Sequence, residues 1–160
     1  MAMDAYLKID GIPGEAKQKG YPDWIQLDGW TWGSSTAGQA ERGGGLIGGK
    51  VQMQDFHFTK MTDKATPKLF ESCCKGQVFK EIKLQVVRMP ENQVVIDVKM
   101  EHCIVSSYQT GGGSGDGGVP IENGSLNFSK VFLQMSAFKE DGTKEGMVQA
   151  GWDMAKMTKV

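Results

Sequence analysis

The sequence lacks a disulfide framework, a membrane-spanning run and a secretory signal. Its three cysteines, Cys73, Cys74 and Cys103, are odd in number and two are adjacent, which excludes the disulfide pattern of a small secreted scaffold. No stretch of about eighteen apolar residues occurs, and the first residues have neither a basic start nor an apolar run. We therefore expect synthesis in a reducing cytoplasm, and any export to use a route that the sequence itself does not address.

An excess of charge of either sign is also missing. Eighteen Lys and Arg residues stand against nineteen Asp and Glu residues, so the formal net charge is -1. Such a chain has no basic field to bind nucleic-acid phosphates or an anionic membrane surface. Its 160 residues suffice for one domain, residues 1–160, with a self-sufficient core, but not for two.

Alternation of apolar and polar residues is the main pattern that is present, and it predicts half-buried strands. The alternation changes parity at Asp28-Gly29 and again at Asp55, where we expect a bulge or bend. Residues 126–138 carry large apolar side chains on both faces, as expected of a strand covered by the core and by a partner. The expected strands are 5–9, 24–32, 51–58, 82–86, 94–101, 126–138 and 148–154.

One segment, residues 66–76, departs from this period and predicts a short helix. Thr66 is a candidate N-cap, Pro67 follows it, and Gly76 stands at the expected end. On a helix, the apolar set would lie on one inward face, with both thiols packed as small apolar groups. That set is Leu69, Phe70, Cys73 and Cys74.

Glycine is abundant, with 22 of 160 residues, and 13 of the 22 lie in Gly33–Gly49 and Gly111–Gly118. Both stretches join strand-like segments, so we interpret them as loops within one domain. Connections this long are uncommon in a compact domain and tend to be functional. Contact with another subunit would order them.

Motifs for cofactors and metals are incomplete. Gly44–Lys50 resembles a phosphate-binding loop, but Val51 stands where a Ser or Thr should bind magnesium, and a strand follows where a helix is required. The His and Cys residues have no zinc-type spacing, and neighbours such as His102 and Cys103 point to opposite faces of a strand. We expect no cofactor and no metal.

Catalytic arrangements are similarly weak. Ser114 sits in a glycine loop and misses the second glycine of a nucleophile elbow. Asp55 and His57 share a strand face and could form a hydrogen-bonded dyad, but no partner nucleophile is identifiable. A hydrolase using this pair is one alternative, and a structural contact between the two is favoured over it.

Three tryptophans, Trp24, Trp30 and Trp32, lie within nine residues. Exposed tryptophans could stack sugars or anchor a partner, so a carbohydrate-binding β-sandwich is a second alternative. Strand parity favours core packing for Trp30 and Trp32 and leaves Thr31 on a solvent-lined face, which could form a cavity wall. Phe56 and Phe58 are expected in the core.

The chain resembles the Hcp family, the haemolysin-coregulated tube proteins of bacterial type VI secretion, over its whole length. The most specific match is the block Asp55–Leu69, where strand, helix start and proline occur in the family's order. Further matches are Met3–Ile9, Trp30–Gly33, Gly43–Gly49, Val105–Ser107, Glu122–Asn123 and Leu126–Lys130.

The resemblance implies a compact antiparallel β-barrel of two sheets with one short flanking helix. It also implies six-membered rings that stack into a tube, inside a contractile sheath and behind a spike protein. The tube would be expelled from the cytoplasm, could carry small effectors, and would have no enzymatic activity. Thr31 is then a candidate lumen residue. The candidate contact loop between subunits or rings is Gly43, Gly44, Gly45, Leu46, Ile47, Gly48 and Gly49.

Overall fold

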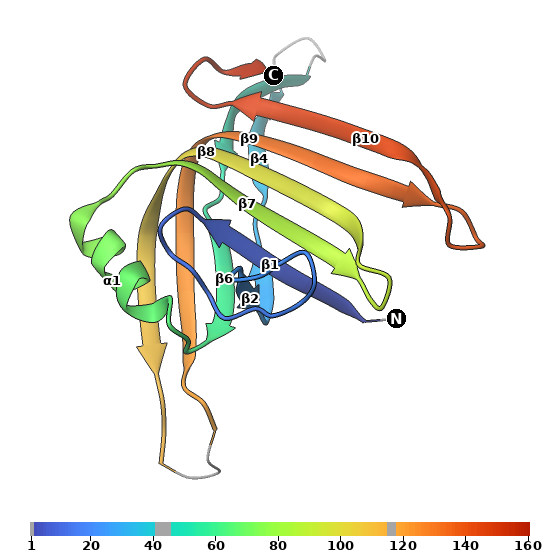
Figure 1. The fold of residues 1–160 in the computed structure, drawn as a ribbon. Coiled ribbons are helices and arrows are strands. Elements are labelled where there is room, and N and C mark those ends of the chain that lie inside the picture. The colour runs from blue at the N-terminus through green and yellow to red at the C-terminus, as the bar shows by residue number, and fades with distance from the viewer. Residues whose placement is uncertain (1, 41–45, 115–117) are drawn as a thin grey trace.

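The computed structural model describes residues 2–40, 46–114 and 118–160. Strands dominate the described residues, as the alternation predicts (Figure 1). In chain order the elements are β1 (Met3–Ile9), β2 (Ile25–Leu27), β3 (Gly29–Thr31), β4 (Ser34–Ala40), β5 (Leu46–Met53), β6 (Phe56–Met61), α1 (Thr66–Lys75), β7 (Phe79–Arg88), β8 (Gln93–Gly111), β9 (Ile121–Phe138), β10 (Lys144–Asp153) and β11 (Thr158–Lys159).

Two long antiparallel strands, β8 and β9, run through both layers of the barrel. The amino-terminal half of β9 pairs with β6, and its carboxyl-terminal half pairs with β10. One layer therefore has the order β11-β10-β9-β8-β7-β1-β2, while β3 and β6 extend β9 in the other layer. Apolar side chains from both layers meet in the main core, and a smaller buried cluster lies around Tyr6, Tyr21 and Val87. The predicted antiparallel barrel of two sheets is confirmed.

The parity change at Asp28 is the point where the chain leaves one layer for the other. β2 pairs with β1 on one side of it, and β3 pairs with β6 on the other. Ile25 and Leu27 are buried before the break, and Trp30 packs against the same core after it. The bend predicted there is confirmed.

The predicted helix is present as α1, with a correction at its N-cap. It ends at Gly76, whose left-handed backbone (φ 61°) suits glycine. The N-cap is Ala65 rather than Thr66. Thr66 instead lies in the first turn, where its hydroxyl accepts the backbone N–H of Asp63. α1 is ten residues long, too short and too polar to span a membrane, and the part of the chain described here has no other helix.

The inward face of α1 is narrower than the sequence suggests. Leu69 and Ser72 are buried and Cys73 is half-buried, whereas Phe70 and Cys74 are exposed. Each residue turns the helix by about 100°, so positions one step beyond the buried ones rotate out of the contact. The prediction that both adjacent thiols pack inward is wrong for Cys74.

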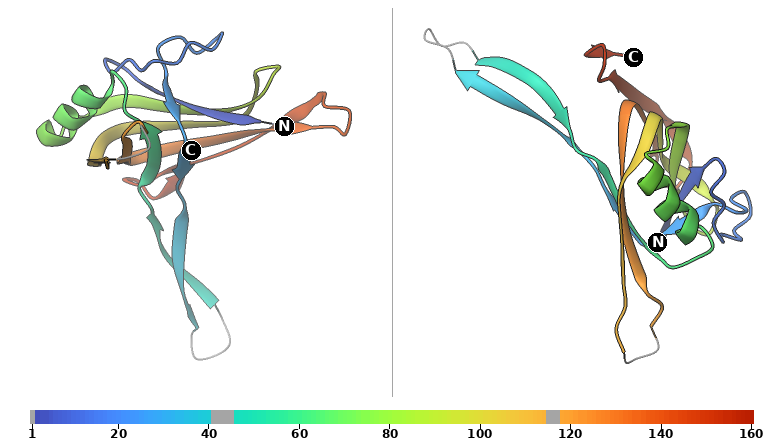
Figure 2. Two further views of the ribbon diagram at one scale, coloured as in Figure 1. Left: turned by 90° about the horizontal axis from the view of Figure 1, so that it is seen from below. Right: turned by 90° about the vertical axis from the view of Figure 1, so that its left-hand side faces the viewer.

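The first glycine-rich stretch is also not a simple loop. β4 and β5 pair from Ser34 opposite Met53 to Ala40 opposite Leu46, forming a two-stranded arm that projects from the barrel (Figure 2). Ser34–Gly38 of β4 are all exposed, so this strand has no alternation of buried and exposed residues that its sequence could reveal. Small, uncharged residues in β4 can still adopt the extended backbone.

Candidate functional site

A row of polar side chains crosses four strands on the outward face of the β3–β6 layer. Strand register places Thr31 opposite His57, His57 opposite Ser125, and Ser125 opposite Ser107. Thr31, His57 and Ser107 are exposed, while Ser125 is buried between its neighbours. We call these four residues the polar row.

The neighbouring row has the same character. Thr59 lies opposite Asn123, and its hydroxyl donates a hydrogen bond to the side-chain oxygen of Asn123 at 3.0 Å. Gln109 continues the row across β8, opposite Asn123. These two rows contain small and polar side chains with no carboxylate, lysine or arginine. Such a surface can hydrogen-bond weakly to many partners but has no charge that would hold one firmly.

The opposite side of the same strands belongs to the core. Phe56 and Phe58 are buried, as predicted, and the ring of Trp30 stacks on Phe56 with centroids 6.3 Å apart. The ring of Trp32 contacts Phe128 edge-on. Strand parity therefore placed Trp30 and Trp32 against the core and left Thr31 exposed, as the sequence predicts.

Asp55 and His57 do not form the dyad that their spacing permits. Ser106 donates to one carboxylate oxygen of Asp55 at 2.7 Å, and the amide of Asn127 donates to the other at 2.8 Å. Ser106 reaches Asp55 because β8 has a register shift beside it. With both oxygens occupied by structural partners, and no hydrogen bond to His57 among the described residues, the pair lacks the arrangement of a base and its orienter.

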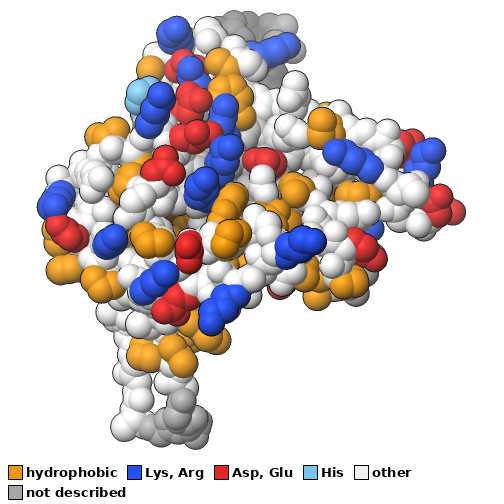
Figure 3. All heavy atoms as spheres, viewed as in Figure 1, with side chains coloured by type: hydrophobic (Ala, Val, Ile, Leu, Met, Phe, Trp, Pro, Cys, Tyr) orange, Lys and Arg blue, Asp and Glu red, His pale blue; other side chains and the backbone are white. Residues whose placement is uncertain are grey.

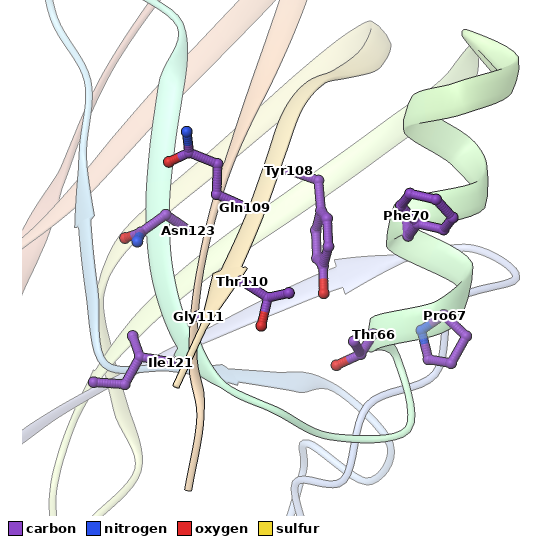
Figure 4. Close-up of a pocket in the computed structure, with 9 residues that line it drawn as sticks. All are labelled: Thr66, Pro67, Phe70, Tyr108, Gln109, Thr110, Gly111, Ile121 and Asn123. Atoms are coloured by element: carbon purple, nitrogen blue, oxygen red, sulfur yellow. The ribbon is translucent and has the colours of Figure 1, made fainter. Parts of the chain in front are cut away.

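A groove of about 830 Å³ lies between α1 and the end of β8. Tyr108 and Thr66 point into it, and Phe70 borders it from the helix (Figure 4). The rings of Phe70 and Tyr108 are 6.1 Å apart. Burial, reinforced by the nearby Glu122 carboxylate, raises the pKa of Tyr108. The groove lining thus offers a phenol that stays protonated at neutral pH, without a paired nucleophile and base.

A fully buried ion pair fastens α1 beside this groove. The Nζ atom of Lys60 lies 2.9 Å from Glu122, 2.9 Å from Asp63 and 2.9 Å from the backbone oxygen of Met61. The hydroxyl of Thr66 donates to the other Glu122 oxygen. All the strong partners come from within the chain, so the cluster is a structural anchor for the helix rather than an open binding site.

Metal ligands and reactive thiols are not gathered at any point of the described chain. No group of three or more His, Cys, Asp or Glu side chains is arranged to hold a metal ion there. Burial raises the pKa of Cys103 to about 12, which keeps this thiol protonated and unreactive. Cys74, by contrast, is exposed on α1.

The glycine segment expected to contact other subunits is divided by the structure. Leu46, Ile47, Gly48 and Gly49 form the start of β5 in the arm, whereas Gly43–Gly45 lie outside the described residues. The backbone of Gly49 passes so close to the carbonyl oxygen of Ala37 that a Cβ atom would lie 2.7 Å from it. At this position glycine permits the close approach of the two strands.

Sequence reasoning found Thr31 but missed the rest of the polar row. His57 could have been assigned from local parity, because Phe56 and Phe58 on either side of it are core residues. Ser107 and Ser125 could not, since their position depends on register between strands far apart in the chain. Figure 3 shows acidic and basic side chains interspersed over the face drawn there, in keeping with the near-zero net charge.

Comparisons with known proteins agree on one family. The family model described as "Type VI secretion system effector, Hcp" matches residues 6–134. Protein hcp1 of Pseudomonas aeruginosa is 38% identical over 157 residues, covering 96% of each chain. A solved structure of a type six secretion system protein superposes with a TM-score of 0.94 at 28% identity, covering 99% of this chain and 100% of that one. Hcp1 of Salmonella typhimurium gives 0.82 at 26% identity, with both chains fully covered.

Proposed function

The chain belongs to the Hcp family of type VI secretion proteins, and from this membership we infer that it is a structural tube subunit of that secretion system. The match extends over nearly the whole of both chains at 38% identity, and this single observation carries the conclusion. The barrel, the flanking helix and the projecting arm all fall within the matched fold.

Copies of the chain assemble side by side into six-membered rings, and the rings stack into a tube. An assembly of many identical subunits is supported by the net charge of -1, because strongly charged copies would repel one another at close packing. The spike protein at the tip and the contractile sheath around the tube are the expected partners. The tube is built in the cytoplasm and expelled with its tip.

The polar row faces the hollow of the ring in this proposal. Thr31 and His57 are exposed there, and the neighbouring positions are small or amide side chains. A wall of this kind can bind a small effector through weak hydrogen bonds and still let it slide when the tube moves. Thr31 is the residue we assign to effector contact.

The arm makes the contact between rings or subunits. It leaves the barrel as a two-stranded ribbon (Figure 2), and an isolated ribbon of this kind is marginally stable in water. A neighbouring copy would cover it. We assign this contact to the segment Gly43–Gly49, of which Leu46–Gly49 form the start of β5.

Catalysis is not part of the proposed role. The Asp55 oxygens are held by Ser106 and Asn127, and the family is a structural one. The alternative of a carbohydrate-binding module has no support, because Trp30 and Trp32 pack against the core and so do not form a sugar-stacking platform.

Electron micrographs of the negatively stained, purified protein test the proposal. We expect ring-shaped particles with a central hole, and stacks of rings at high protein concentration. A carbohydrate-binding domain or a small hydrolase would give compact particles without a hole. Sedimentation that finds only the single chain at every concentration would contradict the proposal.

A further inference from the structure

Three lysines form a line across the outward face of the larger layer. Lys8 of β1 lies directly opposite Lys83 of β7, and Lys83 lies opposite Lys99 of β8. Residues opposite each other on paired strands point to the same side of the sheet. The residues before and after each of these lysines are buried in the core, so the lysines stand on the solvent side. We call Lys8, Lys83 and Lys99 the lysine row.

An acidic row runs beside the lysine row. Glu81 and Glu101 lie opposite each other, two positions along their strands from Lys83 and Lys99. The Nζ atom of Lys83 is 3.8 Å from Glu81, and that of Lys99 is 3.6 Å from Glu101. All four side chains are partly exposed, and exposed pairs of this kind contribute little to stability. Like charges thus face like charges across the strands, which opposes sheet formation, so the fold itself does not explain the two rows.

Aromatic rings border both ends of the lysine row. Within the described residues Lys8 forms no ion pair, and its Nζ atom lies 5.9 Å from the centre of the Trp24 ring. At the other end, the Nζ atom of Lys99 lies 4.4 Å from the centre of the Phe132 ring. Both rings are partly exposed. The surface therefore combines a line of positive charge with apolar area at either end.

The spacing of the two rows matches an α-helix laid across the strands. Neighbouring strands are about 4.8 Å apart, so the lysine row spans about 10 Å. Side chains on one face of a helix recur about every 5.4 Å, so three successive turns place three carboxylates opposite the three lysines. The two rows are about 7 Å apart along the strands, close to the separation of about 5–6 Å between neighbouring side chains on a helix surface. A basic line on the same helix would then face the acidic row.

Two other occupants match this pattern less well. A polyanion would meet the lysine row with the correct sign, but its continuous negative charge would also meet Glu81 and Glu101. A second copy of this chain does not supply the helix from the described residues, because α1 is the only helix there and Glu71 is its only acidic residue. A separate protein that carries both signs of charge in lines satisfies both rows.

We propose that the lysine row and the acidic row form a docking surface for an α-helix of a partner protein, with a line of carboxylates next to a line of basic side chains. The surface lies on the layer that faces away from the polar row, so a partner held there leaves Thr31 free. Recognition depends on charge, with Trp24 and Phe132 adding apolar contact at the ends.

Fluorescence anisotropy of a labelled synthetic peptide tests the proposal. The peptide has about 20 residues, long enough to form a helix in water, with glutamates on one line and lysines on the next. We expect the double variant Lys83→Glu with Lys99→Glu to raise its dissociation constant about tenfold or more. The matched control is Lys68→Glu with Lys75→Glu on the exposed side of α1, which changes the net charge equally and should bind as the wild type does.

A second peptide, with glutamine in place of each glutamate, separates contact from general attraction. It should bind the wild type weakly, and the Lys83 and Lys99 changes should weaken it no further. Circular dichroism checks that each variant is folded. Lys8→Glu, a single change at the exposed end of the row, should raise the dissociation constant of the first peptide about threefold.

Three results would overturn the assignment. One is equal weakening of peptide binding by the control pair on α1, and another is equal binding of the two peptides by the wild type. The third is tighter binding of heparin than of the peptide, lost in the Lys83 and Lys99 variant, which would identify a polyanion site. Peptide binding is measured on the full chain in solution whether or not it assembles, so none of these results bears on the proposed tube.

Discussion

Lys60 and Glu122 form an ion pair that is completely buried although the two residues are 62 positions apart, with Nζ and Oε2 separated by 2.9 Å. Lys60 is further surrounded by Asp63 and the backbone oxygen of Met61, while Glu122 accepts the Thr66 hydroxyl. The pair therefore joins β6, β9 and the start of α1 at one point. Charges buried in this way are tolerated because each has several partners.

Removal of one member of this pair should be strongly destabilising. We expect Lys60→Met to lower the free energy of unfolding by about 3–5 kcal/mol, since it leaves the Glu122 carboxylate buried without its cation. The double variant Lys60→Met with Glu122→Leu should recover part of the loss. Urea unfolding of each variant measures these differences.

An exposed ion pair on α1 is the control for the effect of burial. Lys75 and Glu71 pair on the surface of α1, and Glu71→Gln should change the free energy of unfolding by no more than about 0.5 kcal/mol. If Glu71→Gln and Lys60→Met lowered the free energy of unfolding equally, burial would not explain the importance of the Lys60–Glu122 pair.

Gly124 is a second position where the packing of the core leaves no room for a side chain. It lies on β9 directly opposite Phe58, and a Cβ atom added to it would collide with the Phe58 ring. We expect Gly124→Ala to cost about 1–3 kcal/mol through overpacking of the core. The comparison is Gly29→Ala on β3, where a Cβ atom would meet no atom within 4 Å. Thermal unfolding of both variants should show a lowered midpoint for Gly124→Ala alone; similar midpoints would argue against the clash.

Local periodicity in the sequence predicted the parts of the fold that have one buried face. The break at Asp28, the helix end at Gly76 and the opposite orientations of Trp30 and Thr31 all follow from side-chain direction within a few residues. The helix face was less well predicted, because Phe70 lies at the edge of the buried stripe, where one residue's rotation decides its exposure.

The features that the sequence did not predict depend on distant pairing. Within the described residues, the strand at Ser34–Ala40 pairs with β5 alone, and its exposed part carries no alternation that would mark it as a strand. The Lys60–Glu122 pair and the contact of Ser107 with Ser125 both require the register of β9. Register is set by the assembled sheet, and a single sequence contains no local signal for it.

Cys74 and Cys103 should differ sharply in reactivity. With a pKa of about 12, only about one Cys103 thiol in ten thousand is ionised at pH 8, and the thiolate is the reactive form. Cys74 is exposed and Cys103 is fully buried. Alkylation of the folded protein with iodoacetamide at pH 8, read by peptide mass spectrometry, should modify Cys74 and leave Cys103 intact. Rapid labelling of Cys103 without denaturant would contradict the burial of this thiol.

The raised pKa of Cys103 also predicts how the free energy of unfolding responds to alkaline pH. A cysteine in an unfolded chain ionises near pH 8.5, whereas the folded chain retains the Cys103 proton up to about pH 12. The unfolded state alone gains charge between these values, so this contribution to stability is complete below about pH 8.5 and is lost as the pH rises toward 12. We expect the stability of the wild type to decline more steeply over this range than that of Cys103→Ala, as measured by denaturant unfolding at each pH.

Thr31 links the fold to the proposed transport role, since it is exposed at the end of the polar row while its neighbours Trp30 and Trp32 hold the strand against the core. We expect Thr31→Arg to leave stability and ring formation unchanged, because an exposed strand position accepts a long side chain without repacking. Its bulk and charge would project into the hollow of the ring and should reduce both retention of a small effector and its delivery to a neighbouring cell. Gln109→Arg tests whether the neighbouring row, with Thr59 and Asn123, also faces the lumen. Lys80→Arg is the control, because Lys80 is exposed on β7 and the change adds no charge. Unchanged effector retention and delivery in folded, ring-forming Thr31→Arg would show that this face does not line the lumen.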